Sequence, residues 1–127
     1  MTDVSRAISS CIIALFCCLL PVFSITGEHP VLIISSYNPD AGRTSGNISD
    51  FMEEFQRLGG TNTIALENMN CKSFSESPLW ERRMVELLSK YQGDNSPALT
   101  VLIGQEAWAA YLSLPDSIRG NTPVVSA

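Results

Sequence analysis

Runs of apolar residues alternate with stretches of helical periodicity along most of the chain. Residues 31–34 and 99–103 are nearly continuous aliphatic runs, which are typical of strands buried on both faces. Residues 63–66 form a weaker run of the same kind, and residues 122–126 open a fourth. Between these runs, apolar side chains recur every three or four residues, which predicts a helix between successive strands.

Three amphipathic helices are expected. The first carries its apolar positions within residues 48–58 and ends at two glycines. The second begins at Ser77, with a proline in its first turn. The third covers residues 105–114, and its predicted apolar face includes Leu112. Ion pairs four residues apart are expected on the exposed helix faces, namely Glu53 with Arg57 and Glu86 with Lys90.

Strands that alternate with single helices pair in parallel through right-handed crossovers. The expected fold is therefore α/β, an open parallel sheet with helices on both faces, as in a flavodoxin-like lobe. Sheets of this class usually have about five or six strands. Because only four strands are predicted, we expect residues 25–127 to be the first α/β lobe of a longer protein, cut short at its last strand.

The amino-terminal segment has the pattern of a secretory signal. Residues 11–20 are all apolar, Arg6 precedes them, and a small-residue pattern at residues 22–24 places the mature start near Ile25. The apolar run is shorter than the roughly 20 residues of a membrane-spanning helix. We expect residues 1–24 to be a signal peptide that exports the protein to the periplasm or to the periplasmic face of the inner membrane. An uncleaved signal anchor and a buried core helix remain alternatives.

Charge and cysteine content narrow the possible partners. The formal net charge is −5, so the polyanionic backbone of a nucleic acid is repelled, and no nucleic-acid partner is expected.

Three of the four cysteines lie in the predicted signal segment. Cys71 then remains alone in the mature chain. For Cys71 we favour a structural role, as a small, partly buried residue near a strand end, over the roles of a reactive thiol or an intermolecular bridge.

Candidate site residues follow the predicted strands, because ligands of open parallel sheets bind beyond the carboxyl ends of the strands. Hydroxyl and amide side chains dominate these positions, with one aromatic ring and one carboxylate. This lining suits a small polar ligand, although turn formation and helix capping also explain such residues. The positions are Ser35, Ser36, Tyr37 and Asn38; Asn68 and Asn70; Gly104, Gln105 and Glu106; and Ser126.

Catalysis, metal binding and phosphate binding find less support. His29 is the single histidine, so a catalytic triad or a zinc site lacks its parts. Residues 41–47 could hold an anion at a helix start, with Arg43 as the cation, but they lack the P-loop and dinucleotide patterns. Asn47 is explained either as a helix cap or as a glycosylation acceptor. No cofactor, metal or enzymatic activity is expected for this chain.

Three segments resemble the first lobe of type 1 periplasmic substrate-binding proteins. They are residues 31–37, residues 102–108 and residues 122–125. In particular, they resemble the ABC-transporter-like sensor regions at the front of bacterial two-component histidine kinases, over roughly residues 30–127. The motifs are an aliphatic strand followed by a hydroxyl and an aromatic residue, a glycine turn into a helix, and a Pro-Val-Val strand.

The resemblance implies ligand sensing or solute binding outside the cytoplasm, with a small polar ligand held between two lobes and domain closure as the signal. The second lobe, the membrane part and any kinase core would belong to a parent chain. Ser36, Tyr37, Gly104, Gln105 and Ser126 would face the ligand. Two alternatives stay open: a small flavodoxin-like enzyme or electron carrier, and a phosphoacceptor receiver domain, although the residues after the first and third strands suit both poorly.

Overall fold

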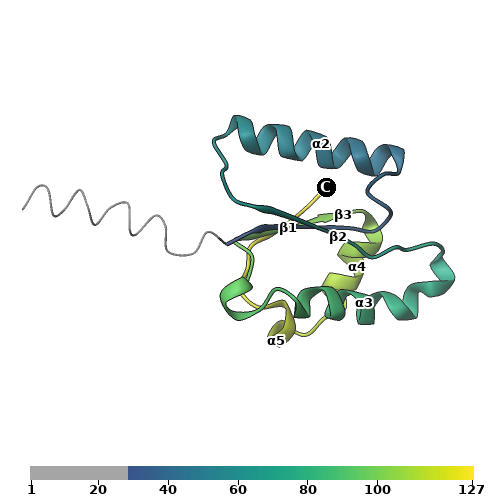
Figure 1. The fold of residues 1–127 in the computed structure, drawn as a ribbon. Coiled ribbons are helices and arrows are strands. Elements are labelled where there is room, and N and C mark those ends of the chain that lie inside the picture. The colour runs from purple at the N-terminus through teal and green to yellow at the C-terminus, as the bar shows by residue number, and fades with distance from the viewer. Residues whose placement is uncertain (1–28) are drawn as a thin grey trace, which may run out of the picture.

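The computed structural model describes residues 29–127 and shows a parallel sheet between helices (Figure 1). The predicted signal peptide, residues 1–24, lies outside the described residues. The strands are β1 (Val31–Ser35), β2 (Ile64–Asn68), β3 (Leu99–Ile103) and β4 (Val124–Ser126). They lie in the order β2-β1-β3-β4, and all neighbours are parallel. This confirms the predicted α/β fold with an open parallel sheet.

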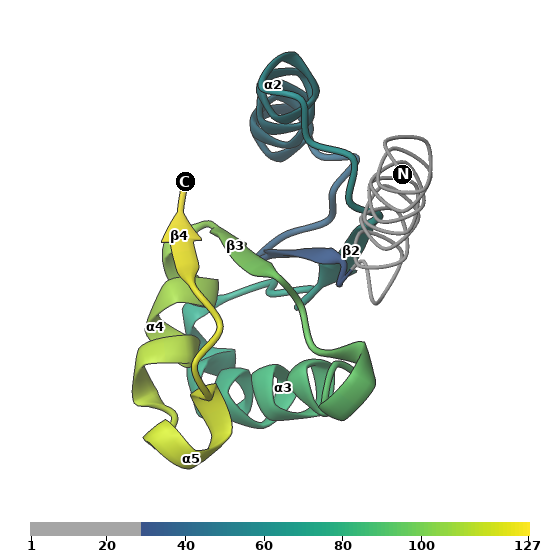
Figure 2. The same ribbon diagram turned by 90° about the vertical axis from the view of Figure 1, so that its left-hand side faces the viewer.

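Helices cover both faces of the sheet, as predicted. They are α2 (Gly42–Arg57), α3 (Ser77–Ser89), α4 (Gln105–Ser113) and α5 (Asp116–Arg119), with short 3-10 turns η1 (Phe74–Glu76) and η2 (Gly93–Asn95). Helix α2 lies on one face, whereas α3, α4 and α5 lie on the other (Figure 2). The sheet therefore has two buried faces, which explains why its central strands read as continuous aliphatic runs.

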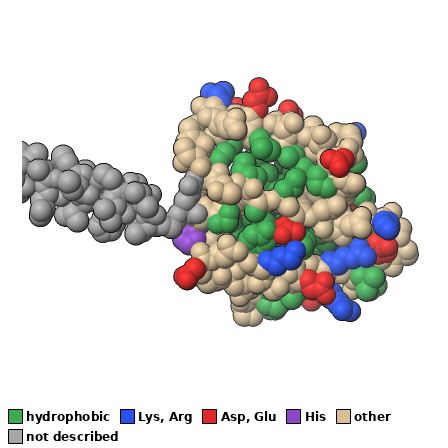
Figure 3. Space-filling model, in the orientation of Figure 1, with side chains coloured by type: hydrophobic (Ala, Val, Ile, Leu, Met, Phe, Trp, Pro, Cys, Tyr) green, Lys and Arg blue, Asp and Glu red, His purple; other side chains and the backbone are tan. Residues whose placement is uncertain are grey.

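Each face of the sheet has its own hydrophobic core. Alternate residues of β1 supply both cores: Val31 and Ile33 pack on the α2 side, and Leu32 and Ile34 pack on the α3 and α4 side. The second core is larger and contains the fully buried Met84 of α3. Figure 3 shows hydrophobic side chains between α2 and the sheet, with charged side chains of both signs spread around them.

The strand register aligns the carboxyl ends of three strands at one edge of the sheet. Ser35, the last residue of β1, lies level with Asn68 of β2 and with Ile103 of β3. From β1 the chain continues into α2 on one face, and from β3 it continues into α4 on the opposite face (Figure 2). The carboxyl ends of β1 and β3 therefore form a topological switch point, where open α/β sheets leave a crevice for ligands.

Some local expectations are wrong. Helix α2 begins at Gly42, six residues before its first buried side chain, so Asn47 lies within the helix and does not cap it. Leu112 is 51% exposed. The buried stripe of α4 consists of Ala107, Ala110 and Tyr111, and Leu112 falls outside that stripe.

Arg57, Glu86 and Lys90 also pair with residues other than the partners expected within their helices. Arg57 pairs with Glu54, three residues before it, through two hydrogen bonds. Glu86 pairs with Arg82 at 3.1 Å. Lys90 lies one residue beyond the end of α3 and instead reaches Glu67 of β2 at 3.3 Å. All of these groups except Glu67 are largely solvated, so these pairs add little to stability.

Candidate functional site

An open cavity of about 460 Å³ lies at the switch point between the ends of β1 and β3. Its wall comes from four places: the second residue after β1, the first two turns of α2, the turn from β3 into α4, and the residue that follows β4. The residues are Tyr37; Arg43, Thr44 and Asn47; and Ile103, Gly104, Gln105, Glu106 and Ala127. The structure thus brings together three of the five residues predicted to face a ligand, namely Tyr37, Gly104 and Gln105.

Ser36, the residue after β1, is completely buried and joins β1 to α4. Its Oγ donates a hydrogen bond to the carbonyl of Ile103 at 3.0 Å and accepts one from the backbone amide of Ala107 at 2.9 Å. The Ser36 amide also donates to the Ile103 carbonyl, at 2.8 Å. Because these bonds engage the hydroxyl inside the protein, Ser36 positions the cavity wall and does not line the cavity.

Gly104 is the position where α4 must approach β1 most closely. A Cβ atom at this position would lie 2.4 Å from Ser36 Oγ and 2.8 Å from Ser36 Cβ, well inside van der Waals contact. Its φ of +99° is also in the region that side-chain-bearing residues rarely adopt. Glycine therefore allows the β3 to α4 turn to close over the Ser36 hydroxyl, so that the first turn of α4 faces the cavity.

A hydrogen bond between Tyr37 and Glu106 crosses the switch point. The Tyr37 hydroxyl donates to Glu106 Oε1 at 2.5 Å, joining the second residue after β1 to the first turn of α4. This bond raises the pKa of the Tyr37 hydroxyl. Burial of Glu106 acts to raise the pKa of its carboxyl group, but the hydrogen bonds it accepts from Tyr37 and from its own backbone outweigh burial and lower the pKa. At neutral pH the pair is a neutral phenol and a carboxylate.

Arg43 and Gln105 complete the polar lining. Both side chains are exposed, and Arg43 forms no ion pair with any residue from 29 to 127. The cavity therefore offers a carboxylate, a guanidinium, an amide and a phenol ring that is 43% exposed. These groups can bind a small polar molecule that carries both hydrogen-bond donors and acceptors.

The remaining predicted residues lie outside this cavity. Ser126 is exposed on β4, whereas its neighbour Ala127 lines the cavity and accepts a hydrogen bond from the Gly104 amide at 3.2 Å. Thr44 and Asn47 also line the cavity. The sequence named them only as part of residues 41–47, a possible anion-binding stretch, and Arg43, Thr44 and Asn47 all lie within the first two turns of α2.

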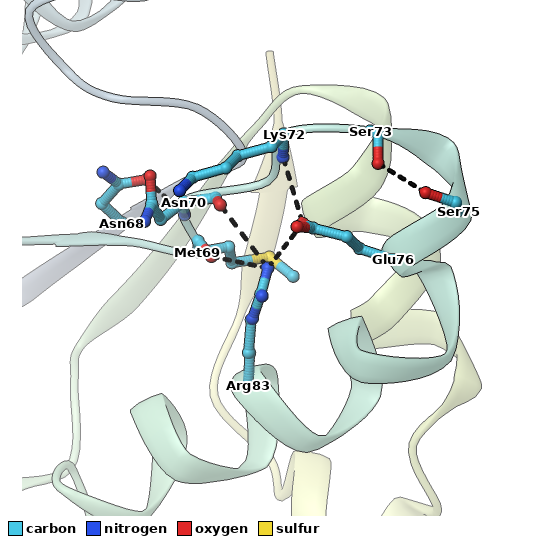
Figure 4. Close-up of polar contacts among 8 residues, drawn as sticks. All are labelled: Asn68, Met69, Asn70, Lys72, Ser73, Ser75, Glu76 and Arg83. Carbon is cyan, nitrogen blue, oxygen red and sulfur yellow. Dashed lines mark hydrogen bonds and ion pairs between the residues drawn. The ribbon is translucent and has the colours of Figure 1, made fainter.

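The amides after β2 shape a loop (Figure 4). Asn68 Oδ1 accepts a hydrogen bond from the Asn70 amide at 2.7 Å, and Asn70 adopts a positive φ of 53°. Arg83 of α3 points toward this loop. It contacts the carbonyls of Met69 and Asn70 at 3.5 Å and pairs with Glu76 at 3.1 Å. These contacts hold the loop from β2 to α3 in one conformation, and neither asparagine lines the cavity.

Cys71 is buried in the larger core beside this loop, which agrees with the structural role expected from the sequence. Its backbone amide donates to the Ser36 carbonyl at 2.9 Å. Burial raises the pKa of its thiol, whereas reactive cysteines have a lowered pKa. The position therefore favours packing over nucleophilic chemistry.

Comparisons with family models, with curated proteins and with solved structures find no match to this chain. Residues 29–127 contain no cluster of three or more side chains suited to hold a metal ion. Within the same residues, no helix is both long and apolar enough to span a membrane. The resemblance to periplasmic binding-protein lobes thus stays a prediction.

We expect Gly104→Ala to lower the free energy of unfolding by about 2–4 kcal/mol, because the new methyl group overlaps Ser36 and the backbone has a positive φ. Gly46→Ala is the matched control. Gly46 lies inside α2 with open space around it, so alanine should raise stability by about 0.5–1 kcal/mol. Urea denaturation measures both changes. Equal stability of the two variants would contradict the close approach of Gly104 to Ser36.

The Tyr37–Glu106 bond predicts a specific titration. Its stabilising effect is present below the ordinary tyrosine pKa of about 10 and is lost as pH rises through the raised pKa of Tyr37. At the acidic end, it is lost as pH falls through the lowered pKa of Glu106. In Glu106→Gln, the pKa of Tyr37 should fall toward the ordinary value.

NMR titration of ring-labelled tyrosine measures this shift, and Tyr91 provides an internal control. Burial, together with a hydrogen bond to Glu67, raises the pKa of Tyr91 to about 12. That value should not change in Glu106→Gln. A Tyr37 pKa that is the same in both proteins would show that the bond does not form in solution.

Proposed function

We propose that this α/β unit is the ligand-binding first lobe of an exported sensor or solute-binding protein, and that it binds a small polar molecule at the switch point. The observation that carries this proposal is the cavity where Tyr37, Glu106 and Arg43 meet between the ends of β1 and β3. This is the place where open α/β sheets bind ligands. The sensor would be the amino-terminal part of a two-component histidine kinase, or the lobe would belong to an ABC-type binding protein.

Each cavity residue has a distinct proposed role. The Glu106 carboxylate accepts hydrogen bonds from an amine or hydroxyl group of the ligand, and Arg43 pairs with an acceptor or anionic group. The exposed ring of Tyr37 packs against the flat or apolar part of the ligand. Gln105 can donate and accept hydrogen bonds. Ser126 lies outside the cavity, exposed on β4, and its proposed contact is with a part of the ligand that extends beyond the cavity toward β4.

Binding suits this site better than catalysis. The hydroxyl nearest the switch point, Ser36 Oγ, is held by two backbone groups, and the Cys71 thiol is buried with a raised pKa. Neither group is an activated nucleophile. The cavity is also open on one side, which suits a second lobe that closes over the ligand and converts binding into domain movement.

To test this proposal, the purified chain is mixed in turn with free amino acids, monosaccharides, dicarboxylates and FMN, and its amide NMR spectrum is recorded each time. We expect one of the polar compounds to shift the signals of Tyr37, Gln105 and Arg43. Tyr37→Ala and Gln105→Ala should each weaken binding by about tenfold or more, because each removes stacking or a hydrogen bond. Ser75→Ala is the control: this exposed serine bonds only to Ser73 and should leave affinity unchanged.

Two results would overturn the assignment. Wild-type affinity in both variants would show that the ligand binds elsewhere, and binding of FMN as a yellow complex would favour an electron carrier. A separate measurement addresses export: peptide mapping of cell-envelope and cytoplasmic fractions. We expect envelope peptides that begin near Ile25, and recovery of the chain from the cytoplasm with residues 1–24 attached would contradict export.

A further inference from the structure

A second cavity, of about 470 Å³, lies at the amino-terminal edge of the sheet, away from the switch point. Two segments of the chain form it: residues 91–97 between α3 and β3, and residues 117–123, which run from within α5 to the start of β4. A smaller cavity of about 40 Å³ shares part of this lining and is also lined by Thr100 and Tyr111. The volume falls within the range of small-molecule sites, roughly 300–1,000 Å³.

Arg119, at the end of α5, lines both the larger and the smaller cavity. Its guanidinium lies 6.0 Å from the centre of the Tyr111 ring, and Nη2 pairs with Asp116. The Nε atom is buried and has no hydrogen-bond partner among the described residues. A buried charged donor without an acceptor is costly. Because Arg119 lines this cavity, the cavity lies beside a donor that no described residue satisfies.

The charge balance around Arg119 favours an anionic acceptor. Asp116 is 93% exposed, so water screens its pairing with Arg119 and leaves much of the guanidinium charge uncompensated. No other ion pair to Arg119 forms within residues 29–127. Arginine hydrogen bonds are strongest with carboxylate or phosphate oxygens.

The rest of the lining fits a compact organic molecule. Pro97, Ile118 and Pro123 provide apolar surface, and Ser96 and Asn121 provide hydrogen-bonding groups. We propose that this cavity binds a small organic carboxylate, with a carboxylate oxygen accepting a hydrogen bond from Arg119 Nε and the carbon chain lying against the two prolines. Its binding ties the loop after α3 to the connection between α5 and β4. This site is independent of the switch-point cavity.

Thermal unfolding of the chain with propionate tests the site, with propionamide and sodium chloride as matched probes. Propionate has the same shape as propionamide but carries the charge, and sodium chloride reports the effect of ionic strength alone. A ligand that binds only the folded chain raises Tm in a concentration-dependent way. We expect propionate to raise Tm, to saturate, and to shift the Arg119 Nε–H signal in NMR spectra, whereas the two other solutes do not.

Three variants separate this site from general effects. Arg119→Lys keeps the cation but removes the Nε–H group, so the affinity for propionate should fall at least tenfold. Ser117→Phe, at an exposed position in the cavity wall, should block the cavity and leave Arg119 unchanged. Arg82→Lys alters an arginine that is distant from the cavity and paired with Glu86, and it should retain wild-type affinity.

Several outcomes would overturn the proposal. One is an equal Tm rise with propionate and with sodium chloride. Another is an unchanged propionate affinity in Ser117→Phe, which keeps the test decisive even if Arg119→Lys unfolds. A third is an Arg119 Nε–H signal that contacts only water in the presence of propionate, since this would show that a bound water satisfies the group.

Discussion

The buried hydroxyl of Ser36 is the contact on which the arrangement of the switch point depends. It links the end of β1 to the carbonyl of Ile103 and to the first turn of α4 through Ala107, and the Ser36 carbonyl accepts a hydrogen bond from Cys71 after β2. Three neighbouring segments therefore meet at one residue. Removing the hydroxyl would leave the buried Ala107 amide without a partner, which typically costs about 1–3 kcal/mol.

The Tyr37–Glu106 pair follows from this arrangement. The two residues are 69 positions apart in sequence. They meet because parallel pairing sets Ser35 level with Ile103, and because Gly104 lets α4 begin close to Ser36. The chemistry of the cavity thus depends on strand register and on one glycine. Neither constraint involves the ligand, so the site is formed before anything binds.

Much of the fold could be predicted from the sequence. The aliphatic runs identified the strands, because a strand buried on both faces needs apolar side chains at nearly every position, and the alternation with helices predicted parallel pairing. The site was predictable only as a region. Sequence placed Ser36 at the correct edge, but it could not show whether the hydroxyl faces a ligand or the neighbouring strand. Asn47 was expected at the start of the helix and not within it, because the exposed first turns of α2 carry no apolar periodicity.

Amide hydrogen exchange at Ala107, in the wild-type chain and in Ser36→Ala, tests the central role of Ser36 most directly. In the wild type, the Ala107 amide should be protected nearly as well as the amides of β3, because it donates to a fully buried oxygen. In Ser36→Ala, exchange at Ala107 should accelerate at least tenfold, while the buried amides of β3 remain protected. Unchanged protection at Ala107 would contradict the account, because it would show that α4 does not need the Ser36 hydroxyl to hold its first turn at the switch point.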